Sequence, residues 1–154
     1  MERTLKKFKI DKSVFENFDE LMSKHLDTVE ELTISNIETN SKYFNIISLF
    51  TNIKTLIIEG NSKINIDSII LNLCKPYELN NLILNGTKLP TKVAMKKLVN
   101  LKMISLNNIE YCNLKTFLDA VEKPDKIRAI TLNSVCLSKN SINILKIFKS
   151  LEII

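Results

Sequence analysis

The chain contains few of the residues on which enzymes and metal sites depend. Its 154 residues include two glycines, three prolines, three cysteines, one histidine and no tryptophan. So few glycines exclude a glycine-rich loop that cradles phosphates. The single histidine, His25, is accompanied by no nucleophile motif and no paired metal ligands. We therefore expect a protein that is not an enzyme and that has neither a cofactor nor a metal site.

Long apolar runs are also missing. No stretch approaches the ~18 consecutive apolar residues of a membrane span, and the opening residues MERTLKKFKI do not form a signal peptide. The cysteines, Cys74, Cys112 and Cys136, are odd in number and show no C-x-x-C spacing. These absences predict a cytoplasmic protein without a disulfide framework or membrane association. We expect the cysteines to be buried as small hydrophobic residues.

Arginine is scarce although the net charge is +5. Only Arg3 and Arg128 are present, and lysine supplies the remaining positive charge. Because phosphate-binding surfaces favour arginine and interleaved aromatic residues, a solvated lysine surface is the preferred interpretation. Binding of nucleic acid or of an acidic surface through lysine-rich helices, for instance by Lys92, Lys96 and Lys97, is kept as the alternative function.

What the sequence does contain is an internal repeat. The two glycines, Gly60 and Gly86, end the similar runs IKTLIIEG and LNNLILNG, and the same pattern recurs along the chain at steps of 22 to 26 residues. Position 1 of the repeat is occupied by Leu5, Val29, Ile53, Leu79, Leu101, Ile127 and Leu151. Position 4 is occupied by Phe8, Leu32, Leu56, Leu82, Ile104, Ile130 and Ile154, and position 6 by Ile10, Ile34, Ile58, Leu84, Leu106 and Leu132. All of these residues are hydrophobic.

Alternation at positions 4 and 6 predicts a short strand that buries one face. Position 8 is then occupied by Asn36, Gly60, Gly86, Asn108 and Ser134. Because glycine and asparagine tolerate positive φ, we expect a sharp corner at this position.

A short helix is predicted after each corner. Residues that can cap a helix N-terminus follow at Asn40, Asn65, Thr91, Asn113 and Ser138. In the first unit, Ser13 and Glu16 have the spacing of a capping box. In the two longest units, Pro76 and Pro124 are expected to stop the helix.

The segments LNNLILN, LKMISLN and IRAITLN resemble the L-x-x-L-x-L motif of the leucine-rich repeat family. The resemblance covers residues 5–154 and implies one α/β domain over residues 1–154. Its fold would be a right-handed horseshoe of about seven short repeats, with a concave parallel sheet and helices on the convex side. A doubly wound nucleotide-binding fold is the competing interpretation, but its units need roughly 30 residues or more.

The sequence departs from the family at position 9, where the family usually has asparagine. The residues here are Ile37, Asn61, Thr87, Ile109 and Val135, so the hydrogen bonds of the corner must be arranged differently.

The resemblance also implies a protein partner bound on the concave sheet. The outward positions 3, 5 and 7 are then the candidate partner-binding residues: Glu31, Thr33, Ser35, Thr55, Ile57, Glu59, Asn81, Ile83, Asn85, Met103, Ser105, Asn107, Ala129, Thr131 and Asn133. Ile57, Ile83 and Met103 form an apolar centre within a polar rim, as in a modest protein interface. Equally, isoleucine and threonine simply suit strands.

The two ends of the repeat array differ. Lys7, Lys9 and Asp11 place charge on the first strand, which we expect to blunt an open sheet edge. Residues 151–154 fit the start of a seventh strand with no polar cap after it. We therefore expect this end to form a homodimer or to continue into a longer repeat array.

Overall fold

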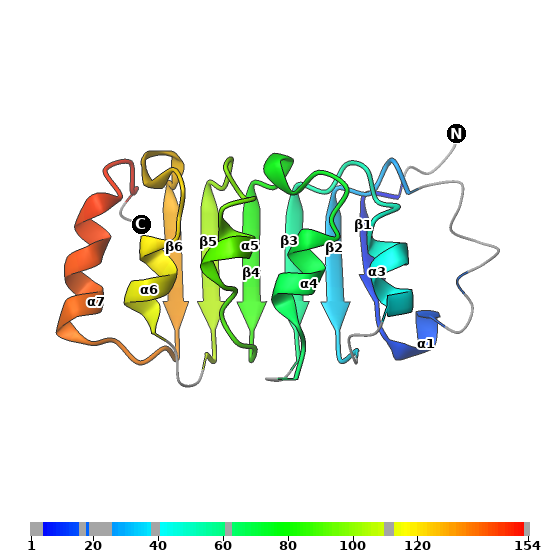
Figure 1. Ribbon diagram of the computed structural model, residues 1–154, viewed down its shortest axis with the longest axis horizontal. Coiled ribbons are helices and arrows are strands. Elements are labelled where there is room, and N and C mark those ends of the chain that lie inside the picture. The colour runs from blue at the N-terminus through cyan, green and yellow to red at the C-terminus, as the bar shows by residue number, and fades with distance from the viewer. Residues whose placement is uncertain are drawn as a thin grey trace.

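A computed structural model shows one parallel β-sheet with short helices between its strands (Figure 1). It describes residues 5–15, 18, 26–37, 41–60, 63–109 and 113–152. The strands are β1 (Lys7–Ile10), β2 (Glu31–Ser35), β3 (Thr55–Glu59), β4 (Asn81–Asn85), β5 (Met103–Asn107) and β6 (Ala129–Asn133). The α-helices are α1 (Lys12–Phe15), α3 (Ser41–Ile47), α4 (Ile66–Leu71), α5 (Lys92–Met95), α6 (Leu114–Asp119) and α7 (Lys139–Ile144). Three 3₁₀ turns are η1 (Pro76–Glu78), η2 (Pro124–Lys126) and η3 (Leu145–Ile147).

The strand order follows the order of the sequence. Among the described residues the sheet has six strands, β1 to β6, and each pairs in parallel with its neighbour in the chain. Every pairing joins equal repeat positions, from Lys7 opposite Glu31 to Met103 opposite Ala129. The predicted parallel α/β architecture and the register of its repeats are thus confirmed.

The hydrophobic core lies between the sheet and its helices. Positions 4 and 6 of β2 to β5 are inaccessible to solvent, and the position 1 residues from Val29 to Ile127 are buried. Helix residues such as Ile69, Phe117 and Leu118 belong to the same core. Figure 1 shows helices α3 to α6 on one face of the sheet. We call the other face, formed by positions 3, 5 and 7 of the strands, the open face.

The corner after each central strand has the predicted backbone conformation. Asn36, Asn108 and Ser134 have φ values of 51°, 52° and 53°, and Gly86 has 64°. Gly60 is at 158°, where a Cβ would lie 2.4 Å from Ile64 Cδ1. At Gly86 a Cβ would lie 3.0 Å from the carbonyl oxygen of Gly60. Gly86 is therefore favoured both by its φ and by the backbone oxygen beside it, whereas at Gly60 the crowding atom is the end of a flexible side chain.

Backbone hydrogen bonds hold the corners without an inward asparagine. The N–H of position 8 donates to the carbonyl of position 7 in the next strand, at 3.1 Å from Gly60 to Asn85 and 2.9 Å from Gly86 to Asn107. Position 9 is instead part of the core, with Ile37, Thr87 and Ile109 buried. Asn61 lies outside the described residues.

The helix starts agree with the sequence only in part. Asn65 Oδ1 accepts from the Ser68 N–H and Asn113 Oδ1 from the Thr116 N–H, as predicted for N-caps. Thr91 precedes α5 but forms no side-chain cap, and its N–H donates to Asp67 Oδ1 at 2.8 Å. Ser138 directly precedes α7, and Asn40 lies outside the described residues.

The N-cap predicted at Ser13 is wrong, and Glu16, the other residue of the predicted capping box, lies outside the described residues. Helix α1 begins at Lys12, and Asp11 Oδ1 accepts from the N–H groups of Ser13 and Val14 at 3.0 and 3.1 Å. A carboxylate one residue before the helix satisfies its free donors, so the cap belongs to Asp11. The Ser13 hydroxyl also donates to Asp11, and this bond is the main cause that lowers the pKa of the Asp11 carboxyl.

The prolines act later than predicted. Helix α4 ends at Leu71 and α6 at Asp119, several residues before Pro76 and Pro124. Each proline instead begins a 3₁₀ turn, η1 or η2, whose first position needs no N–H donor. These turns absorb the extra residues of the two longest units.

The cysteines are not the buried hydrophobic residues that the sequence predicted. Cys74 and Cys136 are exposed free thiols, and Cys112 lies outside the described residues. Cys74 lies in the connection between α4 and η1, and Cys136 in the loop after β6. Both are in connecting segments, where the repeat pattern does not dictate burial.

The last unit is less well covered than the central ones. Ile130 and Leu132 of β6 are only partly buried, whereas the equivalent residues of β2 to β5 are inaccessible. Leu137, Ile142 and Ile147 are 46%, 53% and 41% exposed. The Glu152 N–H donates to the Arg128 carbonyl at 2.8 Å, as in each earlier unit, so a seventh unit starts in register. Residues 153 and 154 lie outside the described residues.

Candidate binding surfaces

The strand register brings all the predicted partner-binding residues onto the open face. Position 5 forms one row across five strands, from Thr33 through Ile57 and Ile83 to Ser105 and Thr131. Positions 3 and 7 form parallel rows on either side of it. Most of these side chains are half-buried because neighbours in adjacent strands cover them. Ser35 is buried at 2% exposure, and Thr131 and Asn133 are exposed.

The apolar centre of the open face is continuous. Ile57 and Ile83 are directly opposite each other on β3 and β4. Met103 lies on β5, diagonal to Ile83, since its direct partner on β4 is Asn81. Diagonal neighbours of this kind are still within reach of long side chains.

A ladder of asparagine side chains borders this centre at position 7. Asn133 Nδ2 donates to Asn107 Oδ1 at 2.8 Å, and Asn107 Nδ2 donates to Asn85 Oδ1 at 2.6 Å. At position 3, Asn81 Nδ2 donates to Thr55 Oγ1 at 2.9 Å. The repeat predicts the positions of these residues but not their bonds, although asparagine in three successive units at position 7 is a signal for a ladder.

The two carboxylates of the open face are both paired with β1. Lys7 Nζ lies 3.2 Å from Glu31 Oε2, and Lys9 Nζ lies 3.4 Å from Glu59 Oε2. These pairs are largely exposed, so their effect on stability is small. They matter more for the charge of the surface, because they leave the centre of the open face without an unpaired charge.

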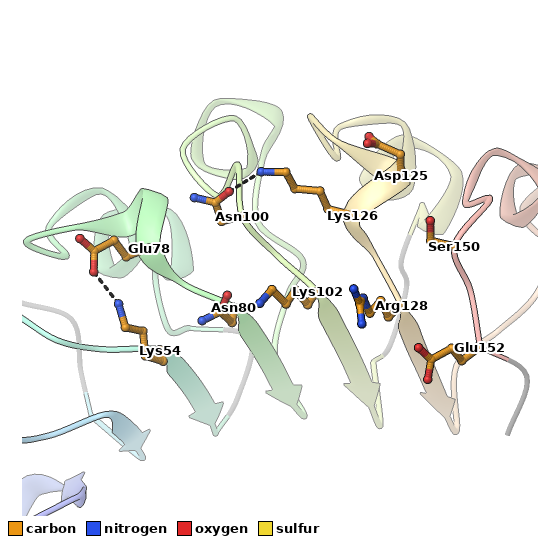
Figure 2. Close-up of a pocket in the computed structure, with 10 residues that line it drawn as sticks. All are labelled: Lys54, Glu78, Asn80, Asn100, Lys102, Asp125, Lys126, Arg128, Ser150 and Glu152. Atoms are coloured by element: carbon orange, nitrogen blue, oxygen red, sulfur yellow. Dashed lines mark hydrogen bonds and ion pairs between the residues drawn. The ribbon is translucent and has the colours of Figure 1, made fainter.

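A second surface, which was not predicted from the sequence, is a groove of about 780 Å³ along the N-terminal ends of the strands. We call it the edge groove, and Figure 2 shows its lining. It is lined by Lys54, Glu78, Asn80, Asn100, Lys102, Asp125, Lys126, Arg128, Ser150 and Glu152. Most of these residues occupy position 2 of a unit or the residue just before position 1. These positions recur in every unit, so the groove has a signal in the repeat, but that signal lies outside the strand positions that predicted the open face.

The backbone of the edge groove is already hydrogen-bonded. The Asn80 and Asn81 N–H groups both donate to the Lys54 carbonyl, at 2.8 and 3.0 Å, and later units repeat this arrangement. A ligand in the groove would therefore be recognised mainly by side chains.

Some of those side chains are engaged with each other. Lys54 Nζ lies 2.5 Å from Glu78 Oε2, and Lys126 Nζ lies 2.5 Å from Asn100 Oδ1. The hydrogen bond from Lys54 is the main cause that lowers the pKa of the Glu78 carboxyl, and Lys75 at 3.5 Å adds to it. Lys102 and Arg128 form no ion pair with any residue that the structure describes.

The described part of the chain contains neither a metal-ligand cluster nor a membrane-spanning helix. Its residues include no group of three His, Cys, Asp or Glu side chains that could hold a metal ion. No helix among them has the length and apolar character needed to cross a membrane. His25 lies outside the described residues. Asp119 pairs with Lys115 at 2.7 Å within α6.

The lysines of the alternative function lie on one helix and its end. Lys92 begins α5, and Lys96 and Lys97 follow its last residue, Met95. All three are exposed. They are on the helix side of the sheet and do not contribute to the lining of the edge groove.

Comparison of the chain with protein-family models, characterised proteins and solved structures gave no significant match.

Proposed function

We propose that the chain is a leucine-rich-repeat solenoid that binds a protein partner through the open face of its sheet and catalyses no reaction. The repeat of about 24 residues, the corners with positive φ and the short helices on one face support this assignment. In such a solenoid the open face would be the concave side of a right-handed horseshoe. Buried position 9 is the feature that differs from the family pattern.

The observation that carries the proposal is the composition of the open face. An apolar centre of Ile57, Ile83 and Met103 is bordered by hydrogen-bonded amides, and both nearby carboxylates are neutralised by β1. Protein interfaces have this arrangement, with depletion of charge at the core and a polar rim. The matching partner would offer an apolar protrusion flanked by amide or hydroxyl groups.

Ile83→Lys tests the proposal because it places a charge at the middle of the open face. Affinity capture followed by mass spectrometry should recover a partner with the wild-type chain and lose it with Ile83→Lys. Val93→Lys is the matched control, since Val93 is 64% exposed on α5, away from the open face. Equal recovery by both variants would contradict the proposal.

Ile83 and its neighbour Leu84 test which face of β4 is buried. Leu84 follows Ile83 and is inaccessible, so Leu84→Ala should lower the free energy of unfolding by ~2 to 5 kcal/mol. Ile83→Lys should leave it nearly unchanged. Urea denaturation measures both, and the reverse order would mean a register slipped by one residue.

The nucleic-acid alternative makes a different prediction. Binding through Lys92, Lys96 and Lys97 would weaken steeply as salt rises, because phosphate contacts release counterions. Binding at the apolar open face should change little with salt.

A further inference from the structure

The edge groove contains a cluster of positive side chains that the open face does not use. Position 2 carries Lys54, Asn80, Lys102, Arg128 and Glu152 in successive units. Lys102 and Arg128 are neighbours in this row, since the Arg128 N–H donates to the Lys102 carbonyl at 2.8 Å. Like charges on adjacent strands are unfavourable. The pair does not stabilise the fold and is therefore a candidate for binding a ligand.

The cluster differs from the neighbouring unit in lacking a carboxylate partner. Lys54 meets Glu78, the residue just before position 1 of the next unit, at 2.5 Å. In the next unit the residue equivalent to Glu78 is Asn100, beside Asn80. In the unit after that the equivalent residue is Lys126, beside Lys102. The Lys126 ammonium donates to Asn100, which is neutral. Figure 2 shows Lys102 and Arg128 side by side at the starts of their strands, with Lys126 above them reaching toward Asn100.

The groove has the dimensions of an extended peptide. Its position 2 row crosses from Lys54 to Glu152, four strand spacings of about 4.8 Å, which gives roughly 19 Å. An extended chain of about six residues has this length. The amide of Asn80 lies in the same row as the cations and can hydrogen-bond to a peptide backbone. The Asn100 amide is already engaged, since its Nδ2 donates to the Tyr77 carbonyl at 2.7 Å and its Oδ1 accepts from Lys126.

The remaining charges of the groove argue against a nucleic acid. Asp125 and Glu152 also line it, and neither makes an ion pair with a residue in the described part of the chain. A continuous phosphate backbone would meet these carboxylates, and the lining offers no aromatic side chain for base stacking. A single anionic group held between Lys102, Lys126 and Arg128 avoids both problems.

We propose that the edge groove binds a peptide segment of a protein partner through one anionic side chain, held by Lys102, Lys126 and Arg128. The anion is a carboxylate or a phosphate, which share the oxygen acceptors that lysine and arginine bind. This site shares no residue with the open face, so the two proposals can fail separately.

Fluorescence anisotropy with labelled six-residue peptides tests the site. One peptide carries glutamate at its centre, one carries phosphoserine there, and a third carries lysine as the charge control. The groove variant combines Lys102→Gln and Arg128→Gln. The α5 variant combines Lys92→Gln and Lys96→Gln, and it removes the same charge from α5 and the residue that follows it. A glutamate or phosphoserine peptide should bind the wild type and bind the groove variant about five- to tenfold more weakly. The α5 variant should change the affinity less than about twofold.

The melting temperature distinguishes a binding role from a structural one. If Lys102 and Arg128 served only to stabilise the fold, the groove variant would have a lower melting temperature than the wild type. Because the groove variant removes a repulsion between neighbouring strands, its melting temperature should stay the same or rise. Nuclear magnetic resonance shifts caused by the peptide should centre on Asn80, Lys102 and Arg128. The proposal is overturned if neither acidic peptide binds, if both double variants weaken binding equally, or if a single-stranded oligonucleotide occupies the same residues more tightly.

Discussion

At the scale of the residue, one corner position redirects the chain in each central unit. Asparagine, glycine and serine all adopt positive φ there, although only glycine does so without strain. The corner at Gly86 is also crowded, because the carbonyl oxygen of Gly60 lies where a side chain would begin. The glycines are therefore not interchangeable with the asparagines.

Gly86→Ala should lower the free energy of unfolding by about 1 to 2 kcal/mol, because alanine is strained at a φ of 64° and its Cβ would contact the Gly60 carbonyl. Asn108→Gly is the matched control at a φ of 52°, and it should leave stability unchanged or slightly raised. Chemical denaturation compares them. A Gly86→Ala protein as stable as the wild type would contradict this account of the corner.

Glu78 gives a prediction about pH. Its pKa in the folded chain is below the ordinary value of 4.5 because Lys54 donates to it. Because its pKa is lowered, ionised Glu78 stabilises the folded chain at pH values above the ordinary pKa. This contribution is lost as the pH falls through the pKa of the folded chain. Lys54→Gln should raise the Glu78 pKa toward 4.5 and weaken the loss of stability on acidification.

Nuclear magnetic resonance titration of the Glu78 carboxyl measures this change. Lys115→Gln, which breaks the pair with Asp119 on α6, is the control and should leave the pKa of Glu78 where it is. A Glu78 pKa unaffected by Lys54→Gln would show that the hydrogen bond is not its cause.

Some residue-scale features followed from the sequence and others did not. Burial at positions 4 and 6 and the corner at position 8 could be predicted because each rests on a pattern repeated in several units. The exposure of Cys74 and the cap at Asp11 could not, because both depend on where a connecting segment leaves the repeat. The edge groove was missed for a related reason: its charges interact between units rather than within one.

At the scale of the element, the helices are short and depend on their starts. Helices of four to seven residues, such as α5 and α3, are too short to be stable alone. Their stability comes from packing on the sheet and from satisfying the first N–H groups. Strands were easier to predict, since alternation marks their ends more sharply than a short amphipathic run marks those of a helix.

Asn65→Ala should therefore cost about 0.5 to 2 kcal/mol, since its side chain accepts from the Ser68 N–H at the start of α4. Thr91→Ala should cost much less, because Thr91 precedes α5 without a side-chain cap. Urea denaturation of both variants tests the difference. Equal costs would mean that α4 does not depend on its cap.

At the scale of the whole molecule, the two ends of the sheet are covered differently. Phe8 of β1 stacks on Phe50 at a centroid distance of 5.8 Å, which shields the first unit. At the other end, Leu137, Ile142 and Ile147 stay exposed around β6. Self-association through this last unit stays a prediction, and so does continuation into a longer array.

Sedimentation over a range of protein concentrations tests self-association. We expect the isolated chain to form dimers as its concentration rises, and Ile142→Lys to shift the equilibrium toward monomer because it charges the exposed apolar surface. Val93→Lys is the control, since it charges an exposed apolar residue of a central unit. A monomer at every concentration would remove dimerisation.

The order of the strands has a consequence for how the chain is made. Each strand pairs with the one synthesised immediately before it, so no unit has to wait for a distant segment to leave the ribosome. Once the first strand and helix have formed, every new strand has a neighbouring strand with which it can pair. Folding can then advance at the pace of translation, with the newest unit always the least protected.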